Sequence, residues 1–199
     1  LPMTGKSTAR EIMQKLLDGV KVPQTYLHFG STEEVARRDA EHDWTEEEAV
    51  LTQAKKEQLI RERWRAESGM GVMAEKMLPT IREYIKAGKL VIIDNLYSDE
   101  ERGVLKKEFG GDKLVVVALA ADWNVRVRRA ANRLERPLSE VELRVRDDAE
   151  IYNLHKGPAI ALADFTIANN VNETTEPEAA RKLIEDALKE RVLPVVLAS

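Results

Sequence analysis

The stretch "LPMTGKSTAR", residues 1–10, decides how the rest of the chain is interpreted. A phosphate-binding loop follows the pattern G-x-x-x-x-G-K-[ST] and leads from a β-strand into a helix. Leu1 to Thr4 fill the four variable positions, and Gly5, Lys6 and Ser7 complete the pattern. The first glycine would stand immediately before Leu1. We therefore expect a glycine there, preceded by roughly five apolar residues of a central first strand that this chain lacks.

The residue types of this stretch suit the binding of a nucleotide's phosphates. Main-chain N–H groups and the positive end of the following helix attract anions, and Gly5 allows close approach. Lys6 would reach the β- and γ-phosphates of ATP, and the Ser7 hydroxyl would bind Mg²⁺. Thr4 and Thr8 would add phosphate contacts. A bare G-K-[ST] also occurs by chance at helix starts, but the amphipathic helix and the parallel-type strands expected downstream favour nucleotide binding.

The composition describes an ordinary globular protein and excludes several kinds of partner. Hydrophobic residues make up 43% of the 199 residues and charged residues 33%, which argues against disorder. The net charge of -4 gives no basic field for nucleic acid. The absence of cysteine excludes disulfides and cysteine metal sites, and fits a reducing compartment. No apolar run approaches the ~18 residues of a membrane helix, so we expect a cytoplasmic protein without a membrane partner.

Strands and helices alternate along the chain. The apolar runs "KLVIIDNL" (89–96) and "KLVVVALAAD" (113–122) are typical of parallel strands buried on both faces. Apolar residues at i, i+4 spacing predict a helix whose core stripe is Met73, Met77, Ile81 and Ile85. This alternation indicates an α/β fold with a parallel sheet. Further strands are expected at 25–30 and 165–170, and further helices at 6–17, 32–67, 98–111, 124–134, 139–152 and 177–191.

Asp94 ends the apolar run "VIIDN" and is the candidate carboxylate for Mg²⁺. A carboxylate at the end of a strand beside a phosphate loop can steady the metal directly or through water. The simpler interpretation is a polar residue that ends a buried strand. The phosphate-binding pattern at residues 1–7 favours the role near the metal.

Arginines are concentrated in the two helices expected around residues 124–153. Arginines neutralise the charge that develops in phosphoryl transfer, and a closing helix pair would exclude water. We expect Arg133 and Arg136 to take part, together with Arg129, while Arg144 and Arg146 reach in from the second helix. The alternative is a solvated charged face.

Taken in this order, the three elements resemble the P-loop small-molecule kinases. "RLERPLSEVELRVRDDAE" is similar to the lid of dephospho-CoA kinase and the related archaeal and bacterial nucleotide kinases. "ALADFTIANN" is similar to their A-D-x-x-I-x-N segment, and "IDNLYSDEERGVLKKEFG" resembles their D-G-x-R-S-x-x-E strand and helix. The resemblance implies that Asp164 opens the last strand and that Asn169 begins the loop that holds the adenine of ATP.

The resemblance also implies an architecture and an activity. The fold would be a P-loop NTPase, with three α/β/α layers, a parallel sheet and an inserted helical lid. One kinase domain would span 1–199, with an acceptor-binding helical region at 25–88 and lid helices at 124–153. With ATP and Mg²⁺, it would transfer the γ-phosphoryl group to a small nucleotide-like acceptor.

The acceptor is left open between two classes. The family often has an acid after the second strand as a base for a hydroxyl acceptor, but Ser31 stands near that point. The candidate bases are then Glu33, Glu34, Asp39 and Asp94. A nucleoside monophosphate acceptor, of the adenylate or cytidylate type, needs no base. Arg37 and Arg38 would clamp its phosphate, unless they are solvated helix charges. Asn95, which stands where relatives often have glycine, is also expected to bind the acceptor. A non-catalytic nucleotide-binding regulatory protein is the third possibility.

Overall fold

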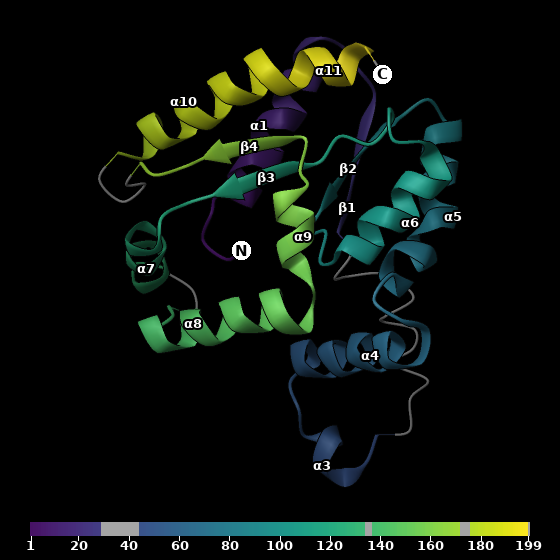
Figure 1. Cartoon of the computed structure of the whole chain (residues 1–199), viewed down its shortest axis with the longest axis vertical. Helices are drawn as coiled ribbons and strands as arrows, with labels where there is room; N and C mark the ends of the chain where they lie inside the picture. Colours follow the sequence, from purple (N-terminus) through teal and green to yellow (C-terminus); the bar gives the residue numbers. More distant parts are fainter. Residues whose placement is uncertain (29–43, 134–136, 172–175, 199) are drawn as a thin grey trace.

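The chain folds as a mixed α/β protein, seen in Figure 1 as two small sheets surrounded by helices. The computed structural model describes residues 1–28, 44–133, 137–171 and 176–198. Within these ranges, no helix combines the length and the apolar character that crossing a bilayer requires. The helices and the parallel strand pairs together confirm the predicted α/β class.

The strands form two separate parallel pairs. β1 (Gln24–His28) pairs with β2 (Leu90–Asp94), and β3 (Val117–Ala120) pairs with β4 (Phe165–Ala168). The predicted parallel pairing is confirmed, but a single continuous sheet is wrong for the residues that the structure describes. The reason is that β2 and β3 do not pair with each other: both line a cavity between the two sheets. For the same reason β2 remains only partly buried along its length.

One core joins the first helix to the C-terminal helices. α1 (Lys6–Gly19) packs against α10 (Pro177–Ala187) and the π-helical turn η2 (Leu188–Val192), which continues into α11 (Leu193–Ala198). In Figure 1 these helices lie together on one side of β3 and β4. The fully buried residues of this core include Leu17 and Ile184. This packing fixes the position of α1, and with it the end of the candidate phosphate loop.

A second core lies against β2. α5 (Val72–Lys86) and α6 (Asp99–Phe109) pack on each other, and Met77, Ile81 and Leu105 are buried between them and the strand. The predicted stripe along α5 is confirmed except for Ile85, which is 48% exposed in the last turn. The turn before α5 is tight, because a Cβ on Gly71 would lie 3.0 Å from Val104 Cγ2.

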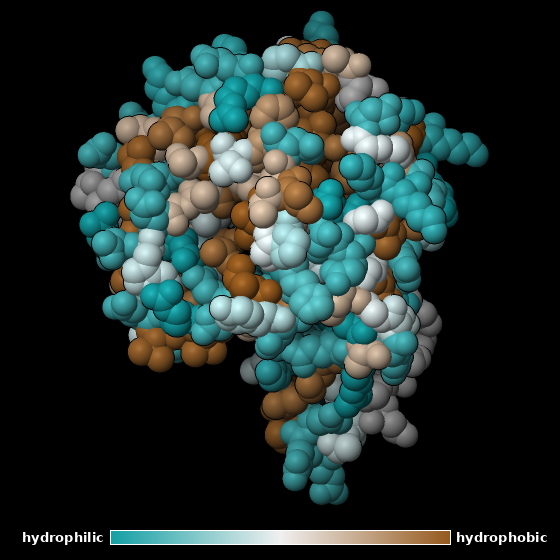
Figure 2. All heavy atoms as spheres, viewed as in Figure 1, coloured by the Kyte–Doolittle hydropathy of each residue, from teal (hydrophilic) through white to brown (hydrophobic). Residues whose placement is uncertain are grey.

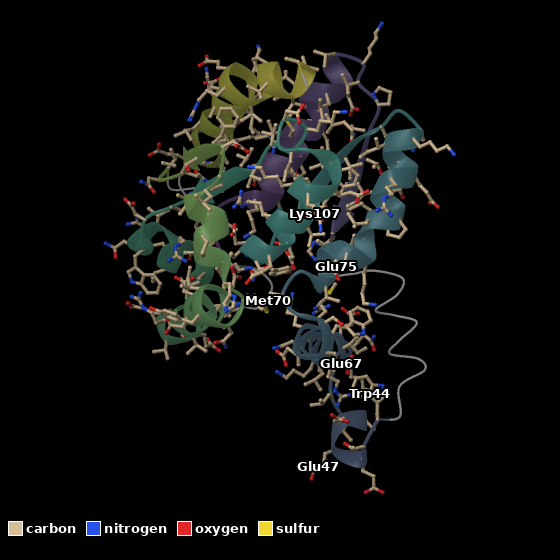
Figure 3. The ribbon with its side chains drawn as sticks, turned by 45° about the vertical axis from the view of Figure 1, so that its right-hand side comes forward. Trp44, Glu47, Glu67, Met70, Glu75 and Lys107 are labelled. Atoms are coloured by element: carbon tan, nitrogen blue, oxygen red, sulfur yellow. The ribbon has the colours of Figure 1, made fainter. Side chains whose placement is uncertain are left out.

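Two helices extend away from the sheets as a separate lobe, clearest in Figure 3, where Trp44 lies beside them. They are α3 (Glu46–Ala49) and α4 (Gln53–Ser68). Ile60, Trp64 and Met73 form a small core there, and Trp44 packs against it. Figure 2 shows that hydrophilic side chains cover much of this lobe on the face in view.

The arginine-rich region folds as a helix pair. α7 (Trp123–Ala131) and α8 (Glu140–Asp148) lie where they were predicted, although α7 ends before residue 134. Ser139 starts α8 with a capping box in which the Ser139 hydroxyl accepts the Glu142 N–H. α8 continues through the π-helical turn η1 (Ala149–Asn153). A short helix that the sequence did not predict, α9 (Lys156–Ala161), follows it.

Candidate nucleotide site

The candidate loop leads directly into the N-terminus of α1. Gly5 has φ 96 and ψ 22, a left-handed conformation that favours glycine, and α1 begins at Lys6. Among the described residues no side chain caps this end. The first N–H groups of the helix have no partner within it. Ser7 lies exposed on this first turn and Thr8 is partly buried. The arrangement offers main-chain donors and the positive end of the helix dipole to an anion.

Buried side chains from other parts of the chain donate hydrogen bonds to the main-chain carbonyls of the loop. Arg129, 7% exposed, donates to the carbonyls of Met3 (3.0 Å), Asn169 (3.0 Å) and Val171 (2.7 Å). The fully buried Asn169 donates from Nδ2 to the Thr4 carbonyl at 3.2 Å. The Thr4 side chain is itself buried, and its hydroxyl donates to the carbonyl of Leu1 at 3.1 Å. Buried side chains from α7 and the end of β4 thus fix the position of the loop.

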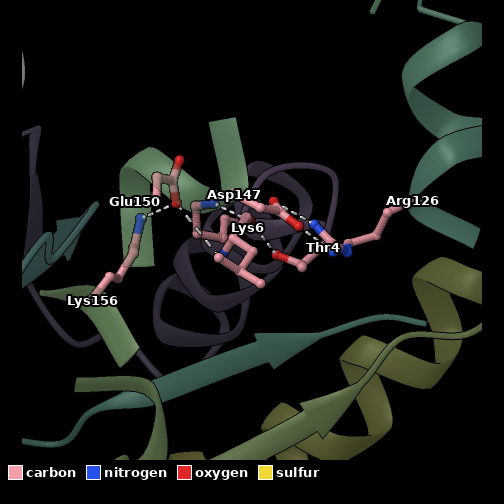
Figure 4. Close-up of polar contacts among 7 residues, drawn as sticks. Thr4, Lys6, Arg126, Asp147, Glu150 and Lys156 are labelled. Atoms are coloured by element: carbon pink, nitrogen blue, oxygen red, sulfur yellow. Dashed lines mark hydrogen bonds and ion pairs between the residues drawn. The ribbon is translucent and has the colours of Figure 1, made fainter. Parts of the chain in front are cut away.

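Two lysines lie close together at the start of α1, as Figure 4 shows. Lys6 Nζ donates to the Leu1 carbonyl at 2.9 Å, and Lys156 Nζ donates to Glu150 at 2.7 Å. Burial lowers the pKa of the Lys6 ammonium, and the charge of Lys156 lowers it further, while Glu150 and Asp94 act in the opposite direction. Although burial acts to raise it, the pKa of Glu150 stays below its usual value because of Lys156 and Lys6. A desolvated pair of ammonium groups of this kind is suited to binding a phosphate.

A buried ion pair joins the two arginine-rich helices. Arg126 of α7 donates from both terminal nitrogens to Asp147 of α8, at 2.8 and 2.6 Å. Both side chains are almost completely shielded from solvent, at 6% and 10% exposed. The fork of a guanidinium matches a carboxylate in this two-bond geometry. The pair fixes the angle between α7 and α8, and Figure 4 shows it next to Thr4 of the loop.

Asp94 lies at the carboxyl end of β2, directly across from His28 of β1. Its carboxylate accepts a hydrogen bond from the Tyr26 hydroxyl at 3.0 Å, and Arg10 Nη1 lies 3.9 Å away. Arg10 also stacks on the Tyr26 ring, 4.5 Å from its centroid. The next residue, Asn95, has φ 64 and contacts His28 at 3.2 Å. Asparagine tolerates this left-handed conformation, which explains how it can stand where glycine is often found.

Lys6 and Asp94 line the same cavity. Its volume is about 310 Å³, and Arg10, Asn95 and Lys156 contribute to the polar part of its wall. The structure therefore brings the end of the candidate phosphate loop and the strand-end carboxylate to one place. These two features were predicted to work together from residues far apart in the sequence.

The oxygen donors at this place suit Mg²⁺ held partly by phosphates. Ser7 offers a hydroxyl at the start of α1 and Asp94 a carboxylate, and Mg²⁺ in proteins usually takes one or two carboxylates plus substrate phosphates and water. Within the described ranges, no cluster of three or more His, Asp or Glu could hold a metal by itself. The donor set fits the first arrangement and no closed protein cage.

A buried glutamate next to this end of β2 was not predicted. Glu101 of α6 is fully buried and accepts the Tyr97 N–H at 2.7 Å. Its other oxygen, Oε1, accepts no hydrogen bond from the part of the chain that the structure describes, and it lies 4.0 Å from Arg65 Nη2 of α4. Burial raises the pKa of Glu101 to about 7, against the effects of the Tyr97 N–H and of Arg65. Arg65 and Lys156 both lie over the Tyr97 ring, so α4, α6 and α9 meet here.

Several predicted residues are not brought to this cluster by the described structure. Arg133 is exposed beyond the end of α7. Arg144 stacks on Trp123, 3.7 Å from the ring centroid. Arg146 is exposed, but its charge adds to the effects of burial and of Lys156 that lower the pKa of the Lys6 ammonium. Their roles in catalysis stay predictions. The remaining candidates lie outside the described residues: Arg37, Arg38, Arg136 and the possible bases Glu33, Glu34 and Asp39.

Sequence reasoning missed some residues that build the site. Arg10 follows Lys6 by four positions, so helical spacing would have placed both side chains on one face of α1. Lys156, Glu150 and Asp147 gave no such signal, because their partners lie on other elements. Arg129 was expected to face phosphates, yet its guanidinium binds main-chain carbonyls of the loop and of the segment after β4.

Comparison with known proteins finds archaeal relatives. The chain is 31% identical over 186 residues to a UPF0200/UPF0201 protein of Archaeoglobus fulgidus, covering 92% of this chain and 52% of that protein. It is 29% identical over 130 residues to a UPF0200 protein of Thermococcus onnurineus, covering 64% and 70%. A UPF0200 protein of Thermococcus sibiricus is 30% identical over 123 residues, covering 61% and 64%.

These relatives do not decide the activity. The chain spans about half the length of the Archaeoglobus protein and just under two thirds of the Thermococcus sibiricus one. No protein-family model matches the chain. The name UPF0200 states no activity, so the resemblance to kinases stays a prediction that depends on the site itself.

Proposed function

We propose that this protein is an ATP-dependent kinase of the P-loop type, similar to dephospho-CoA kinase, that acts on a small nucleotide-like acceptor. The observation that carries the proposal is the open N-terminus of α1 behind Gly5, with Lys6 and Lys156 beside it. Main-chain donors, a helix dipole and two desolvated ammonium groups converge there. A triphosphate has the negative charge and the length to contact the main-chain donors and both ammonium groups at the same time.

The chemistry assigned to the residues follows from their positions. Lys6 would stabilise negative charge on the β- and γ-phosphates, and main-chain N–H groups of the loop would hold them in place. Ser7 and Asp94 would hold Mg²⁺, which supplies charge neutralisation between the phosphates. The acceptor oxygen forms a bond to the γ-phosphorus while the bond to the β,γ-bridging oxygen breaks, and ADP leaves. With a hydroxyl acceptor, the proton passes to a carboxylate, for which Asp94 is the candidate among the described residues; in that case it would steady Mg²⁺ through water and not as a direct ligand.

Buried contacts preorganise the proposed nucleotide half. Transition-state stabilisation is largest where donors are already oriented before the reaction begins. Arg129 and Asn169 orient the loop through its carbonyls, and the Arg126–Asp147 pair holds the helices above it. These residues are positioning residues: they act on the nucleotide through the loop.

An acceptor screen tests the proposal. Full-length protein with ATP and Mg²⁺ is incubated in turn with dephospho-CoA, AMP, CMP and a deoxynucleoside monophosphate, and ADP release is measured. Release with dephospho-CoA supports the hydroxyl kinase, and release with a monophosphate alone moves the assignment to a nucleoside monophosphate kinase. ATP binding without transfer to any acceptor would indicate a regulatory nucleotide-binding protein. Failure to bind ATP would overturn the proposal.

A further inference from the structure

The junction of α4, α6 and α9 contains a buried arginine with an unused hydrogen-bond donor. Arg65 lies in the last turn of α4, and its side chain is only 9% exposed. Its Nε has no hydrogen-bond partner within the described ranges. The carboxylate that it faces, Glu101 Oε1, lies 4.0 Å from Nη2, which is too far for a hydrogen bond. Because buried charges are normally paired and hydrogen-bonded, this guanidinium is suited to binding a further group.

Hydrogen bonds at the start of α6 hold Arg65 and Glu101 at this separation. Glu101 uses its other carboxylate oxygen to accept the Tyr97 N–H at 2.7 Å. The Glu101 N–H donates to Ser98 Oγ at 3.1 Å, and the Ser98 hydroxyl donates to the Met70 carbonyl at 3.2 Å. Met70 lies in the connection from α4 to α5, so these bonds fasten the end of α4 to the start of α6. The gap between the two charges is therefore built into the junction.

A second buried cation lies close to the same place. Lys156 Nζ is 5.0 Å from the centroid of the Tyr97 ring, and the Arg65 guanidinium is 5.5 Å from it. The Lys156 side chain is 5% exposed, and its ammonium donates to Glu150 at 2.7 Å. Lys156 thus has a close counterion, whereas Arg65 has none at that distance. An arginine stays charged even when burial lowers its pKa, so positive charge accumulates beside the ring.

The charge of Glu101 decides how strongly this place attracts an anion. Burial raises the pKa of Glu101 to about 7. The groups that face its carboxyl act in the opposite direction: Arg65 of α4, Lys156 of α9, and the N–H groups of Tyr97 and Ser98. At neutral pH roughly half of the molecules therefore carry an uncharged Glu101. An anion bound to Arg65 would repel the ionised carboxylate and favour its protonated form.

We propose that Arg65 and Lys156 form, beside the Tyr97 ring, a binding site for a phosphate-like oxyanion, and that Glu101 takes up a proton from solvent when the anion binds. Arg65 donates hydrogen bonds, and Lys156 supplies a second positive charge. The proton bonds to Oε1 of Glu101, which then donates to an oxygen of the anion; no other bond forms or breaks. The ligand is either a phosphate group carried by an acceptor or free inorganic phosphate. Because Arg65 and Glu101 are not part of the candidate loop, the site does not depend on the proposed kinase activity.

Calorimetric titration of the full-length protein with sulfate tests this site. Sulfate, unlike phosphate, does not itself titrate in the neutral range, so any proton taken up belongs to the protein. Measurements at about pH 7 in two buffers of different ionisation enthalpy give the number of protons. We expect about half a proton per sulfate, which is the ionised share of Glu101 at that pH. The affinity should fall as the pH rises further, because ionised Glu101 competes with sulfate for Arg65.

Four variants separate this site from the candidate loop. Arg65→Met should weaken sulfate binding about 10- to 100-fold, because hydrogen bonds to a charged group are lost. Glu101→Gln should still bind sulfate but take up no proton. Lys6→Ala should retain the proton-coupled binding, and so should Arg82→Met, which removes an exposed arginine of α5. In the Lys6→Ala protein, displacement of sulfate by AMP would identify the phosphate of an acceptor as the ligand, and binding unaffected by AMP would identify free phosphate.

Other results would overturn the inference. Absence of sulfate binding, or equal binding by Arg65→Met, would show that the junction holds no anion site. Loss of all sulfate binding in Lys6→Ala would assign the anion to the candidate loop. Equal proton uptake by Glu101→Gln and the unaltered protein would remove Glu101 from the account. This last comparison leaves Arg65 in place, so it decides the coupling even if Arg65→Met does not fold.

Discussion

The two halves of the candidate site are held together by different kinds of contact. In the nucleotide half, buried Arg129 and Asn169 donate to carbonyls of the loop main chain. In the proposed acceptor half, around the end of β2, Tyr26 and His28 each contact Asp94, and Asn95 contacts His28, all through side chains. Main-chain contacts survive many substitutions in the loop, whereas side-chain contacts change with every substitution. We expect the nucleotide half to bind a constant ligand and the acceptor half to determine specificity.

The largest expected effect concerns the ion pair that supports the nucleotide half. Arg126→Ala leaves Asp147 as a buried charge without its partner, so the free energy of unfolding should fall by about 3–5 kcal/mol. Urea denaturation measures the change, and Arg128→Ala on the exposed side of α7 is the matched control. The double variant Arg126→Met with Asp147→Leu should recover much of the loss. A loss for Arg126→Ala no larger than that of the control would show that the pair does not support this half.

The next effect separates chemistry from folding in the nucleotide half. Lys6→Ala should lower phosphoryl transfer by about 10²–10³-fold, which corresponds to about 3–4 kcal/mol of lost transition-state stabilisation. Its thermal unfolding midpoint should change little, because the loss of the hydrogen bond to Leu1 is offset by the removal of a buried charge next to Lys156. Lys15→Ala, an exposed lysine of the same helix, should keep normal turnover. Near-normal turnover of Lys6→Ala would contradict the role assigned to this residue.

We expect the stability of the protein to depend on pH through the buried Glu101. Its pKa rises from 4.5 to about 7 on folding, so the folded state binds the proton more tightly than the unfolded state. Its contribution to stability is therefore complete below about pH 4.5 and is lost as the pH rises to about 7, a change of a few kcal/mol. Glu101→Gln should remove this slope from urea unfolding measured across the range. Glu75→Gln, an exposed glutamate of α5, should retain it. Identical slopes in all three proteins would show that Glu101 is ionised normally.

A smaller effect is expected at Asn95. Its φ of 64 is left-handed, a conformation that costs other non-glycine residues about 1–2 kcal/mol. Asn95→Ala should therefore be less stable than Asn95→Gly by about that amount, although both lose the contact to His28. Thermal unfolding of the two variants gives the difference directly. Equal midpoints would mean that the segment after β2 relaxes, and that the acceptor half is less rigid than the structure indicates.

Local patterns predicted the elements of this fold better than the contacts between them. Gly5 and the helical spacing after it predicted α1, and the stripe on α5 was correct up to its last turn. The separation of the sheets was not predictable, because it depends on whether β2 and β3 touch. For the candidate site, too, local motifs could be recognised in the sequence, whereas contacts between distant segments could not. Lys6 and Asp94 could be named from motifs, but Lys156, Glu150 and Asp147 become neighbours of the loop only through packing of distant segments.

We propose that residues 4–8 hold the phosphates of a nucleotide. Isothermal titration of full-length protein with ATP and Mg²⁺ tests it most directly, with Lys6→Ala and Lys15→Ala measured in parallel. We predict saturable binding to one site, weakened about 10- to 100-fold in Lys6→Ala, because a hydrogen bond to a charged group contributes about 1.5–3 kcal/mol. Lys15→Ala should bind as the unaltered protein does. The absence of ATP binding, or equal affinity in Lys6→Ala, would contradict the claim.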